Sequence, residues 1–162
     1  MSKMAQVLLV IDMQNDLNGC YHFDDLLSDI NDRIDDYRQN DLPIIFIQHN
    51  DSDLIKGSEE WDFARGLDKK DDDLVVEKPH ANSFYHTELN DLLRENSLKT
   101  IEICGAQTEY CCDTTIKMAH GLGYKILMQP DMTTTKDNDY LNAEDTIAFF
   151  EDIWNKRFVS FI

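Results

Sequence analysis

The stretch KTIEICGAQTEYCCDTTIKMAH (residues 99–120) decides the fold that we predict for this chain. Its apolar, β-branched beginning at 99–104 is typical of a buried strand, and Gly105 followed by Thr108 and Glu109 is typical of a turn into a helix. In open α/β sheets, ligands bind beyond the carboxyl ends of the strands. We therefore expect this turn to carry functional side chains.

Cys111 stands where the predicted helix begins. Unpaired backbone N–H groups and the helix dipole favour a thiolate at that position, so the sequence predicts a lowered thiol pKa. Cys112, Ile116 and Ala119 have the spacing of one apolar stripe facing the sheet, whereas Cys111 lies about 100° away from it. Cys111 is the better candidate nucleophile, and the alternative is that both cysteines are small core residues.

Strand and helix patterns alternate along the rest of the chain. We predict strands at 7–11, 42–47, 74–78 and 124–128 and an edge strand at 157–161. Besides the helix that begins near Cys111 and passes Ile116 and Ala119, we predict helices at 24–40, 87–96 (Thr87 as N-cap) and 143–155. This pattern predicts an α/β fold: one three-layer Rossmann-like domain over residues 1–162, with a mostly parallel sheet of about six strands and helices on both faces. The long polar segment 51–73 is predicted to be a loop, either functional or a lid.

Two further polar residues follow predicted strands directly. Asp12 comes after the apolar run 7–11, and Lys78 ends the strand 74–78. Each has an ordinary explanation, a turn-capping carboxylate for Asp12 and a solvated amine for Lys78. Together with Cys111, however, they place a carboxylate, an amine and a thiol at one edge of the sheet. This combination indicates a functional site at that edge.

Composition excludes several classes of function. The 162 residues carry 32 acidic and 15 basic side chains, a net charge of −17, which argues against binding to nucleic acids or anionic membranes. The four cysteines show no paired framework, and no signal peptide or spanning segment is apparent. We expect a cytoplasmic protein with a small-molecule substrate.

A thiolate beside a lysine and a carboxylate can attack an electrophilic carbonyl carbon. Asp12 would serve as general base and then acid, and Lys78 would hold the carboxylate and lower the thiol pKa. The backbone N–H groups of Gln107 and Cys111 are candidates for stabilising the oxyanion. This chemistry requires no metal or organic cofactor.

Three motifs resemble the isochorismatase-like cysteine hydrolases, a family that includes nicotinamidases. They are Leu9-Val-Ile-Asp12-Met-Gln14-Asn-Asp16, Lys78 followed by Ser83-Phe84, and Gly105-Ala-Gln-Thr-Glu-Tyr-Cys111. The resemblance implies that Asp12 and Lys78 are catalytic and that Cys111, rather than Cys112, is the nucleophile. It also implies a cis peptide bond between Ala106 and Gln107, and a homo-oligomer, either a dimer or a tetramer. We expect the pocket to be lined by His49, Trp61, Phe84, Gln107 and Tyr110.

Departures from the family pattern reduce the range of substrates that we expect. The order His49-Asn50-Asp51 does not reproduce the Asp-x-His pair through which the nicotinamidase branch binds a metal, so we predict no catalytic metal and an unlikely fit for nicotinamide. A cysteine nucleophile favours C–N bonds over the vinyl ether of isochorismate. We therefore predict a hydrolase of a small amide or ureido group. The alternatives are vinyl ether hydrolysis, a non-catalytic binding or assembly member of the fold, and a redox sensor formed by Cys111 and Cys112.

Overall fold

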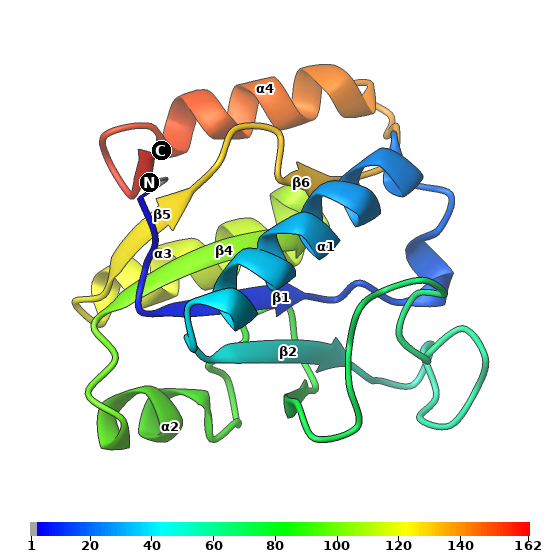
Figure 1. Cartoon of the computed structure of the whole chain (residues 1–162). Helices are drawn as coiled ribbons and strands as arrows, with labels where there is room; N and C mark the ends of the chain where they lie inside the picture. Colours follow the sequence, from blue (N-terminus) through cyan, green and yellow to red (C-terminus); the bar gives the residue numbers. More distant parts are fainter. Residues whose placement is uncertain (1–2) are drawn as a thin grey trace.

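A seven-stranded sheet runs through the computed structural model, which describes residues 3–162 (Figure 1). Its strands are β1 (Val7–Ile11), β2 (Ile44–His49), β3 (Leu74–Lys78), β4 (Thr100–Ala106), β5 (Lys125–Met128), β6 (Thr133–Thr134) and β7 (Val159–Phe161). The order is β3-β2-β1-β4-β5-β7, with β6 beside β4, and the neighbouring pairs are parallel. The predicted α/β fold class is confirmed.

The central strands are apolar because both faces of the sheet are covered. All five residues of β1 are buried, and β1 pairs with β2 on one side and β4 on the other. Strands buried on both faces are expected to be continuous apolar runs rather than alternating ones. This explains why the run Val7–Ile11 and the run Thr100–Ala106 were recognisable from the sequence.

Four α-helices surround the described part of the sheet: α1 (Phe23–Gln39), α2 (Leu89–Glu95), α3 (Asp113–Gly121) and α4 (Ala143–Trp154). Helix α1 lies on one face of the sheet and α3 on the opposite face (Figure 1). The indole Nε1–H of Trp154 in α4 donates to Asp113 Oδ1 at the start of α3, at 2.8 Å. The helix–sheet–helix arrangement is the predicted three-layer architecture.

Several element boundaries differ from the prediction by one or two residues, and three segments differ further. Helix α2 is shorter than expected and begins after Glu88. Thr87 lies one residue further back, where its hydroxyl donates to the Ser83 carbonyl and accepts from the backbone N–H of Leu89 at 3.4 Å. The two-residue strand β6 was not predicted, since so short a segment carries no periodicity. The segment Thr108–Cys112 forms a π-helical turn, η2, ahead of α3.

The segment between β2 and β3 contains no helix or strand of the described chain, as predicted for 51–73. An isolated antiparallel β-bridge between Gln14 and Phe63 joins this segment to the residues that follow β1. Among residues 3–162, no helix is both long enough and apolar enough to cross a membrane.

Candidate active site

The carboxyl edge of the sheet brings Asp12, Lys78 and Cys111 together, and we call these three residues the trio. Asp12 follows β1, Lys78 is the last residue of β3, and Cys111 lies in η2 after β4. The strand order reverses between β1 and β4, because β2 and β3 are added on one side of β1 and β4 and β5 on the other. Open α/β sheets bind ligands at such a point. Lys78 is two strands from β1, roughly 10 Å at the usual strand spacing, a distance that its long side chain spans.

The Lys78 ammonium joins the other two side chains. Its Nζ lies 2.9 Å from Asp12 Oδ2 and 3.3 Å from Cys111 Sγ. The Lys78 side chain is fully buried, and Asp12 is nearly so. The geometry expected from the sequence is therefore present, with the amine placed between the carboxylate and the thiol.

Two backbone features allow β1 and β4 to end so close together. Asp12 adopts a left-handed conformation with φ +49°, which aspartate tolerates better than most residues. Gly105 has φ +126°, and a Cβ atom at that position would lie 2.1 Å from the carbonyl oxygen of Ile11. The peptide bond between Ala106 and Gln107 is cis, as expected from the family resemblance.

The predicted lowering of the Cys111 pKa is wrong for this structure. Burial and the neighbouring Asp12 carboxylate raise the pKa of the Cys111 thiol to about 12, against a lowering effect of Lys78. Cys111 lies inside a π-helical turn and not in the first turn of a regular α-helix, so helix-end stabilisation does not dominate. The resting site holds a thiol whose proton must leave as the sulfur reacts.

Lys78 remains protonated in this environment. Burial acts to lower the pKa of its amine, but the charge of Asp12, the sulfur of Cys111 and hydrogen bonds to both raise the pKa above the ordinary lysine value. The site therefore contains an ammonium and a carboxylate in contact, with the neutral thiol beside them.

The two adjacent cysteines are separated as the helical spacing predicted. Cys112, Ile116 and Ala119 are all buried in the core cluster, whereas Cys111 is partly exposed. Burial raises the pKa of the Cys112 thiol well above its ordinary value. Cys112 is thus a core residue.

His49 lies beside Asp12 and Cys111, and its predicted place in the substrate pocket stays a prediction. Its Nδ1 lies 3.1 Å from Lys78 Nζ and its Nε2 lies 2.6 Å from Asp51 Oδ2. Both ring nitrogens therefore already have protein partners. Its contact with Lys78 follows from the strand register, because His49 and Lys78 are paired between β2 and β3.

Asp12, His49 and Cys111 could also be considered as metal ligands, since one ligand atom of each lies within 4.8 Å of the others. All three, however, lie within hydrogen-bond distance of Lys78 Nζ. Asp12 Oδ2, His49 Nδ1 and Cys111 Sγ therefore face the positive charge of the ammonium, which opposes a cation at the same place. These residues do not fit a metal ion while Lys78 stands between them.

Gln14 has a supporting role that the sequence analysis did not assign. Its fully buried side chain accepts from the backbone N–H of His49 and donates to the His49 carbonyl, at 2.9 and 3.0 Å. It lies 2.8 Å from the Trp61 carbonyl as well. Its position two residues after Asp12 in the first motif was the signal that could have indicated this role.

The other predicted pocket residues are spread around the edge. The Gln107 side chain donates to Thr135 Oγ1 at 3.2 Å, Tyr110 is 56% exposed beside the nucleophile, and Phe84 stacks on Tyr124 and packs against the core. Trp61 is half-buried, with its carbonyl accepting from Gln14 and Gln48. No interaction in the described chain links Phe84 with the trio, so its predicted place in the pocket stays a prediction.

Buried polar atoms without a partner gather on the segments that surround the trio. In residues 3–162 they are Asp12 Oδ1, Asp16 Oδ1, Asn50 Oδ1, Glu109 Oε2 and Trp61 Nε1. Burial raises the pKa of both Asp16 and Glu109. The oxygens are hydrogen-bond acceptors and the indole nitrogen is a donor, so this edge has unused capacity for polar groups of a ligand. Asp16 and Glu109 both lie in the motifs quoted from the sequence, but no role was predicted for either.

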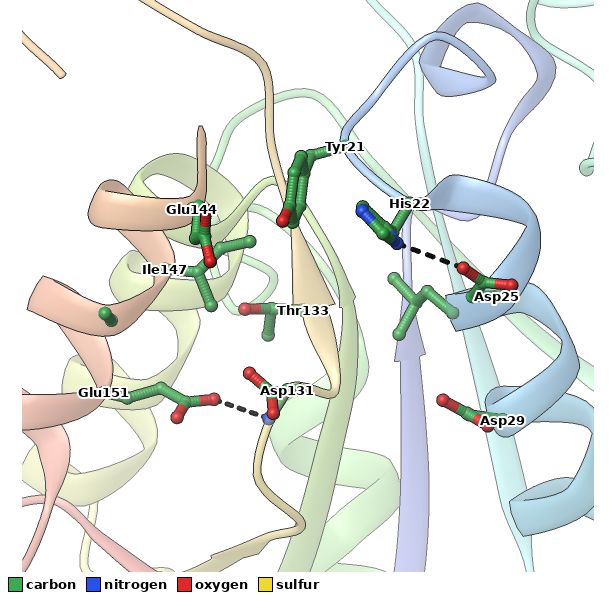
Figure 2. Close-up of a pocket in the computed structure, with 11 residues that line it drawn as sticks. Tyr21, His22, Asp25, Asp29, Asp131, Thr133, Glu144, Ile147 and Glu151 are labelled. Carbon is green, nitrogen blue, oxygen red and sulfur yellow. Dashed lines mark hydrogen bonds and ion pairs between the residues drawn. The ribbon is translucent and has the colours of Figure 1, made fainter. Parts of the chain in front are cut away.

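A separate cavity of about 450 Å³ lies between the start of α1 and α4. Figure 2 shows carboxylates from both helices around it, with His22 bonded to Asp25 and Glu151 bonded to the backbone of Asp131. None of the predicted site residues lines this cavity. It is distinct from the edge that carries the trio.

Comparison with known proteins is consistent with this geometry. The family model for the isochorismatase domain matches residues 6–149. A crystal structure of an isochorismatase family protein shares 46% sequence identity, with a TM-score of 0.93 and 96% of each chain covered. An uncharacterised isochorismatase family protein of Bacillus subtilis is 29% identical over 93% of this chain and 87% of its own. Nicotinamidase 3 of Arabidopsis thaliana is 29% identical over 88% of this chain and 79% of its own.

Proposed function

The chain belongs to the isochorismatase family of hydrolases, and we propose that it hydrolyses a small amide or another C–N bond through an acyl-enzyme on Cys111. The observation that carries the proposal is the contact of one buried ammonium with both a carboxylate and a thiol at the carboxyl edge. A nucleophile, a base and an orienting charge within hydrogen-bond reach are the parts that covalent catalysis requires.

In the first step, Cys111 Sγ attacks the carbonyl carbon of the substrate. The C–S bond forms, the carbonyl π electrons move to the oxygen, and the thiol proton passes to Asp12. Asp12 Oδ1 supports this role because it is buried and has no partner of its own. The backbone N–H groups of Gln107 and Cys111 are proposed as donors to the oxyanion, and losing one such donor typically costs about 10²–10³ in rate.

In the second step, the C–N bond breaks and the proton on Asp12 passes to the departing nitrogen. Water then attacks the thioester and its proton passes to Asp12. The C–S bond breaks as Asp12 gives this proton to sulfur, which releases the acid and restores the Cys111 thiol. Proton transfer by a placed carboxyl group contributes typically 10²–10⁴ in rate. Each step uses only side chains of the trio and water.

Lys78 supports these steps electrostatically. Its ammonium is 3.3 Å from Cys111 Sγ, so it stabilises the negative charge that develops on sulfur during proton loss. It also holds Asp12 Oδ2 at 2.9 Å, which leaves Oδ1 as the oxygen available to the proton.

The substrate class follows from the polar atoms around the trio. The unpartnered oxygens of Asp16, Asn50 and Glu109 would accept hydrogen bonds from N–H groups of an amide or ureido substrate. A dianionic vinyl ether such as isochorismate would instead meet two carboxylates. The nicotinamidase relative is named for an amide substrate, which agrees with C–N cleavage here.

The test is ammonia release from a panel of small primary amides and ureido compounds. We expect turnover of at least one compound, lost by 10²-fold or more in Cys111→Ala, Asp12→Asn and Lys78→Met. Cys112→Ala is the matched control, because it removes the adjacent thiol from the core and leaves the trio intact. Turnover that survives in Cys111→Ala, or disappears equally in Cys112→Ala at full folding, would contradict the mechanism.

We also propose that the protein forms a homo-oligomer. Tyr110 is 56% exposed although it stands next to the nucleophile, which is consistent with a partner chain covering this edge. Light scattering coupled to size-exclusion chromatography tests this, with a mass of twice or four times 18.9 kDa expected. A monomer at micromolar concentration would contradict it.

A further inference from the structure

We propose that Asp51 and His49 are positioning residues for Lys78: Asp51 fixes the tautomer of His49, and the His49 lone pair holds the ammonium between Asp12 and Cys111. The catalytic role of this arrangement rests on the proposed function, because Lys78 supports the Cys111 thiol in the proposed reaction. The arrangement itself rests on contacts that are independent of any substrate.

The tautomer follows from the donors and acceptors around the ring. A lysine ammonium can only donate, so His49 Nδ1, 3.1 Å from Lys78 Nζ, must accept and must carry a lone pair. The single hydrogen of the neutral imidazole is then on Nε2. That nitrogen lies 2.6 Å from Asp51 Oδ2, which accepts the hydrogen.

Asp51 is itself held in one orientation. Its Oδ1 accepts from the backbone N–H groups of Asp53 and Leu54 at 2.8 and 2.9 Å, which leaves Oδ2 directed at His49. The hydrogen bond from His49, followed by those two N–H groups, lowers the pKa of Asp51 to about 2. The carboxylate is therefore ionised, and an acceptor, throughout the neutral range.

His49 is placed from the backbone side as well. Register pairs it with Lys78 across β2 and β3, and the Gln14 amide bonds to both its backbone N–H and its carbonyl. The ring therefore approaches Nζ from a fixed direction. Asp51, His49 and Lys78 form one chain of hydrogen bonds that leads from the loop after β2 to the thiol.

The Lys78 side chain needs such a hold because it crosses from β3 toward β1. Four groups lie within hydrogen-bond distance of its three N–H hydrogens, between 2.9 and 3.3 Å: the Asp12 carboxylate, the His80 carbonyl, His49 Nδ1 and Cys111 Sγ. If His49 Nδ1 carried a hydrogen, two donors, Nδ1–H and the Lys78 ammonium, would face each other and repel. That change would displace Nζ without altering any residue of the trio.

Asp51→Asn produces this change with little disturbance of the loop. The asparagine Oδ1 is required by the N–H groups of residues 53 and 54, so its NH₂ group faces His49 and donates to Nε2. The imidazole hydrogen then moves to Nδ1. An analogous substitution in serine proteases, where the wrong tautomer is stabilised, leaves the geometry intact and strongly reduces the rate.

The first readout is the ¹⁵N NMR spectrum of the imidazoles at pH 7.5, with the His49 signal assigned by its loss in His49→Gln. We expect the hydrogen on Nε2 in the wild type and on Nδ1 in Asp51→Asn. A wild-type His49 that carries its hydrogen on Nδ1, or carries two hydrogens, would overturn the proposal. The wild-type measurement alone decides this point if the variant does not fold.

The second readout is the rate of Cys111 alkylation by iodoacetamide as a function of pH. Displacing the ammonium removes its lowering effect on the thiol pKa, so we expect Asp51→Asn to react about tenfold more slowly at a given pH. Glu77→Gln, which removes a carboxylate from the surface pair with Lys56, is the matched control and should behave like the wild type. An unchanged profile in Asp51→Asn would overturn the proposal. Absence of amide turnover with the expected tautomers would count against the proposed function alone.

Discussion

At the scale of single residues, Asp12 and Lys78 have opposite effects on the Cys111 thiol. The pKa near 12 means that the thiolate fraction, and with it the alkylation rate, rises about tenfold per pH unit across the neutral range. Asp12→Asn removes the neighbouring negative charge, so the thiol pKa falls by roughly one unit or more and alkylation at pH 8 becomes faster. Lys78→Met removes the stabilising cation and makes alkylation slower.

Intact-protein mass spectrometry after brief exposure to iodoacetamide between pH 6 and 9 measures both effects, with Cys111→Ala as the blank. Asp12→Asn should label faster than the wild type and yet lose amide turnover, because the base is gone. Labelling that slows in both variants would show that Asp12 does not raise the thiol pKa.

Gly105 is predicted to be irreplaceable for a steric reason. An added Cβ would lie 2.1 Å from the Ile11 carbonyl oxygen, a backbone atom that cannot move without breaking the pairing of β1 with β4. The positive φ adds strain, and Gly105→Ala should cost more than about 3 kcal/mol in the free energy of unfolding. Urea denaturation measures the loss.

Gly19→Ala is the control for this substitution, since no heavy atom would lie within 4 Å of its Cβ. It should change the unfolding free energy by no more than about 0.5 kcal/mol. Equal stability of the two variants would contradict the close approach of the strands beneath the site.

The residues of the trio could be predicted because Asp12 and Lys78 stand at the carboxyl ends of strands and Cys111 stands in the turn that follows the next strand. That reasoning depends only on the strand pattern, and it identified Asp12, Lys78 and Cys111. The contacts of His49 and Gln14 could not be predicted, because they depend on strand register and on the path of the loop after β2. The Cys111 pKa was predicted with the wrong sign, because burial cannot be assessed from the spacing of residues alone.

At the scale of elements, a buried polar cluster joins α1 to β4. Glu102 accepts from Arg33 Nε and Nη2 at 2.6 and 2.8 Å and from the Tyr37 hydroxyl at 2.7 Å, and all three side chains are buried. Replacing Glu102 removes the buried carboxylate that faces Arg33, while Arg33 Nη1 keeps the partly exposed Asp36 carboxylate at 2.9 Å. Loss of one partner of a buried ion pair typically costs about 3–5 kcal/mol.

Glu102→Gln should therefore destabilise the fold by about 3 kcal/mol or more, as measured by urea denaturation at pH 7. Asp25→Asn on the same helix is the control, because the Asp25 side chain is 80% exposed and its loss should change stability by less than about 0.5 kcal/mol. A Glu102→Gln protein as stable as the control would mean that the cluster does not hold α1 on the sheet.

Long elements were more predictable than short ones for a physical reason. Helix α1 repeats its apolar stripe through Leu26, Ile30 and Ile34, and β1 is apolar throughout, so periodicity identifies both. The strand β6 has two residues, and the π-helical turn η2 has five, which is too short for a periodic pattern. The turn nonetheless carries the nucleophile.

At the scale of the whole molecule, the net charge of −17 is a source of repulsion. Acidic side chains outnumber basic ones by 32 to 15, so screening should relieve more repulsion than attraction. Raising the salt concentration from about 0.02 to about 0.5 M shortens the screening length to a few ångströms and should raise Tm by a few degrees. Differential scanning fluorimetry tests this, and a Tm that falls with added sodium chloride would contradict it.

The arrangement of the whole sheet explains why one edge can hold the reaction. The strand order β3-β2-β1-β4 places the ends of four strands side by side, and Lys78, His49, Asp12 and Cys111 follow those ends in the same order. The fold therefore presents an amine, an imidazole, a carboxylate and a thiol as neighbours. The single domain over 1–162 and the oligomeric state stay predictions.

The most direct measurement for the proposed reaction is mass spectrometry of the acid-quenched protein during turnover of an amide identified by ammonia release. We expect a fraction of the wild-type chains to gain the mass of the acyl group, and peptide mapping to place that group on Cys111. Asp12→Asn should accumulate less of it, and Cys111→Ala none. Turnover without any adduct, combined with full activity of Cys111→Ala, would contradict the acyl-enzyme on Cys111.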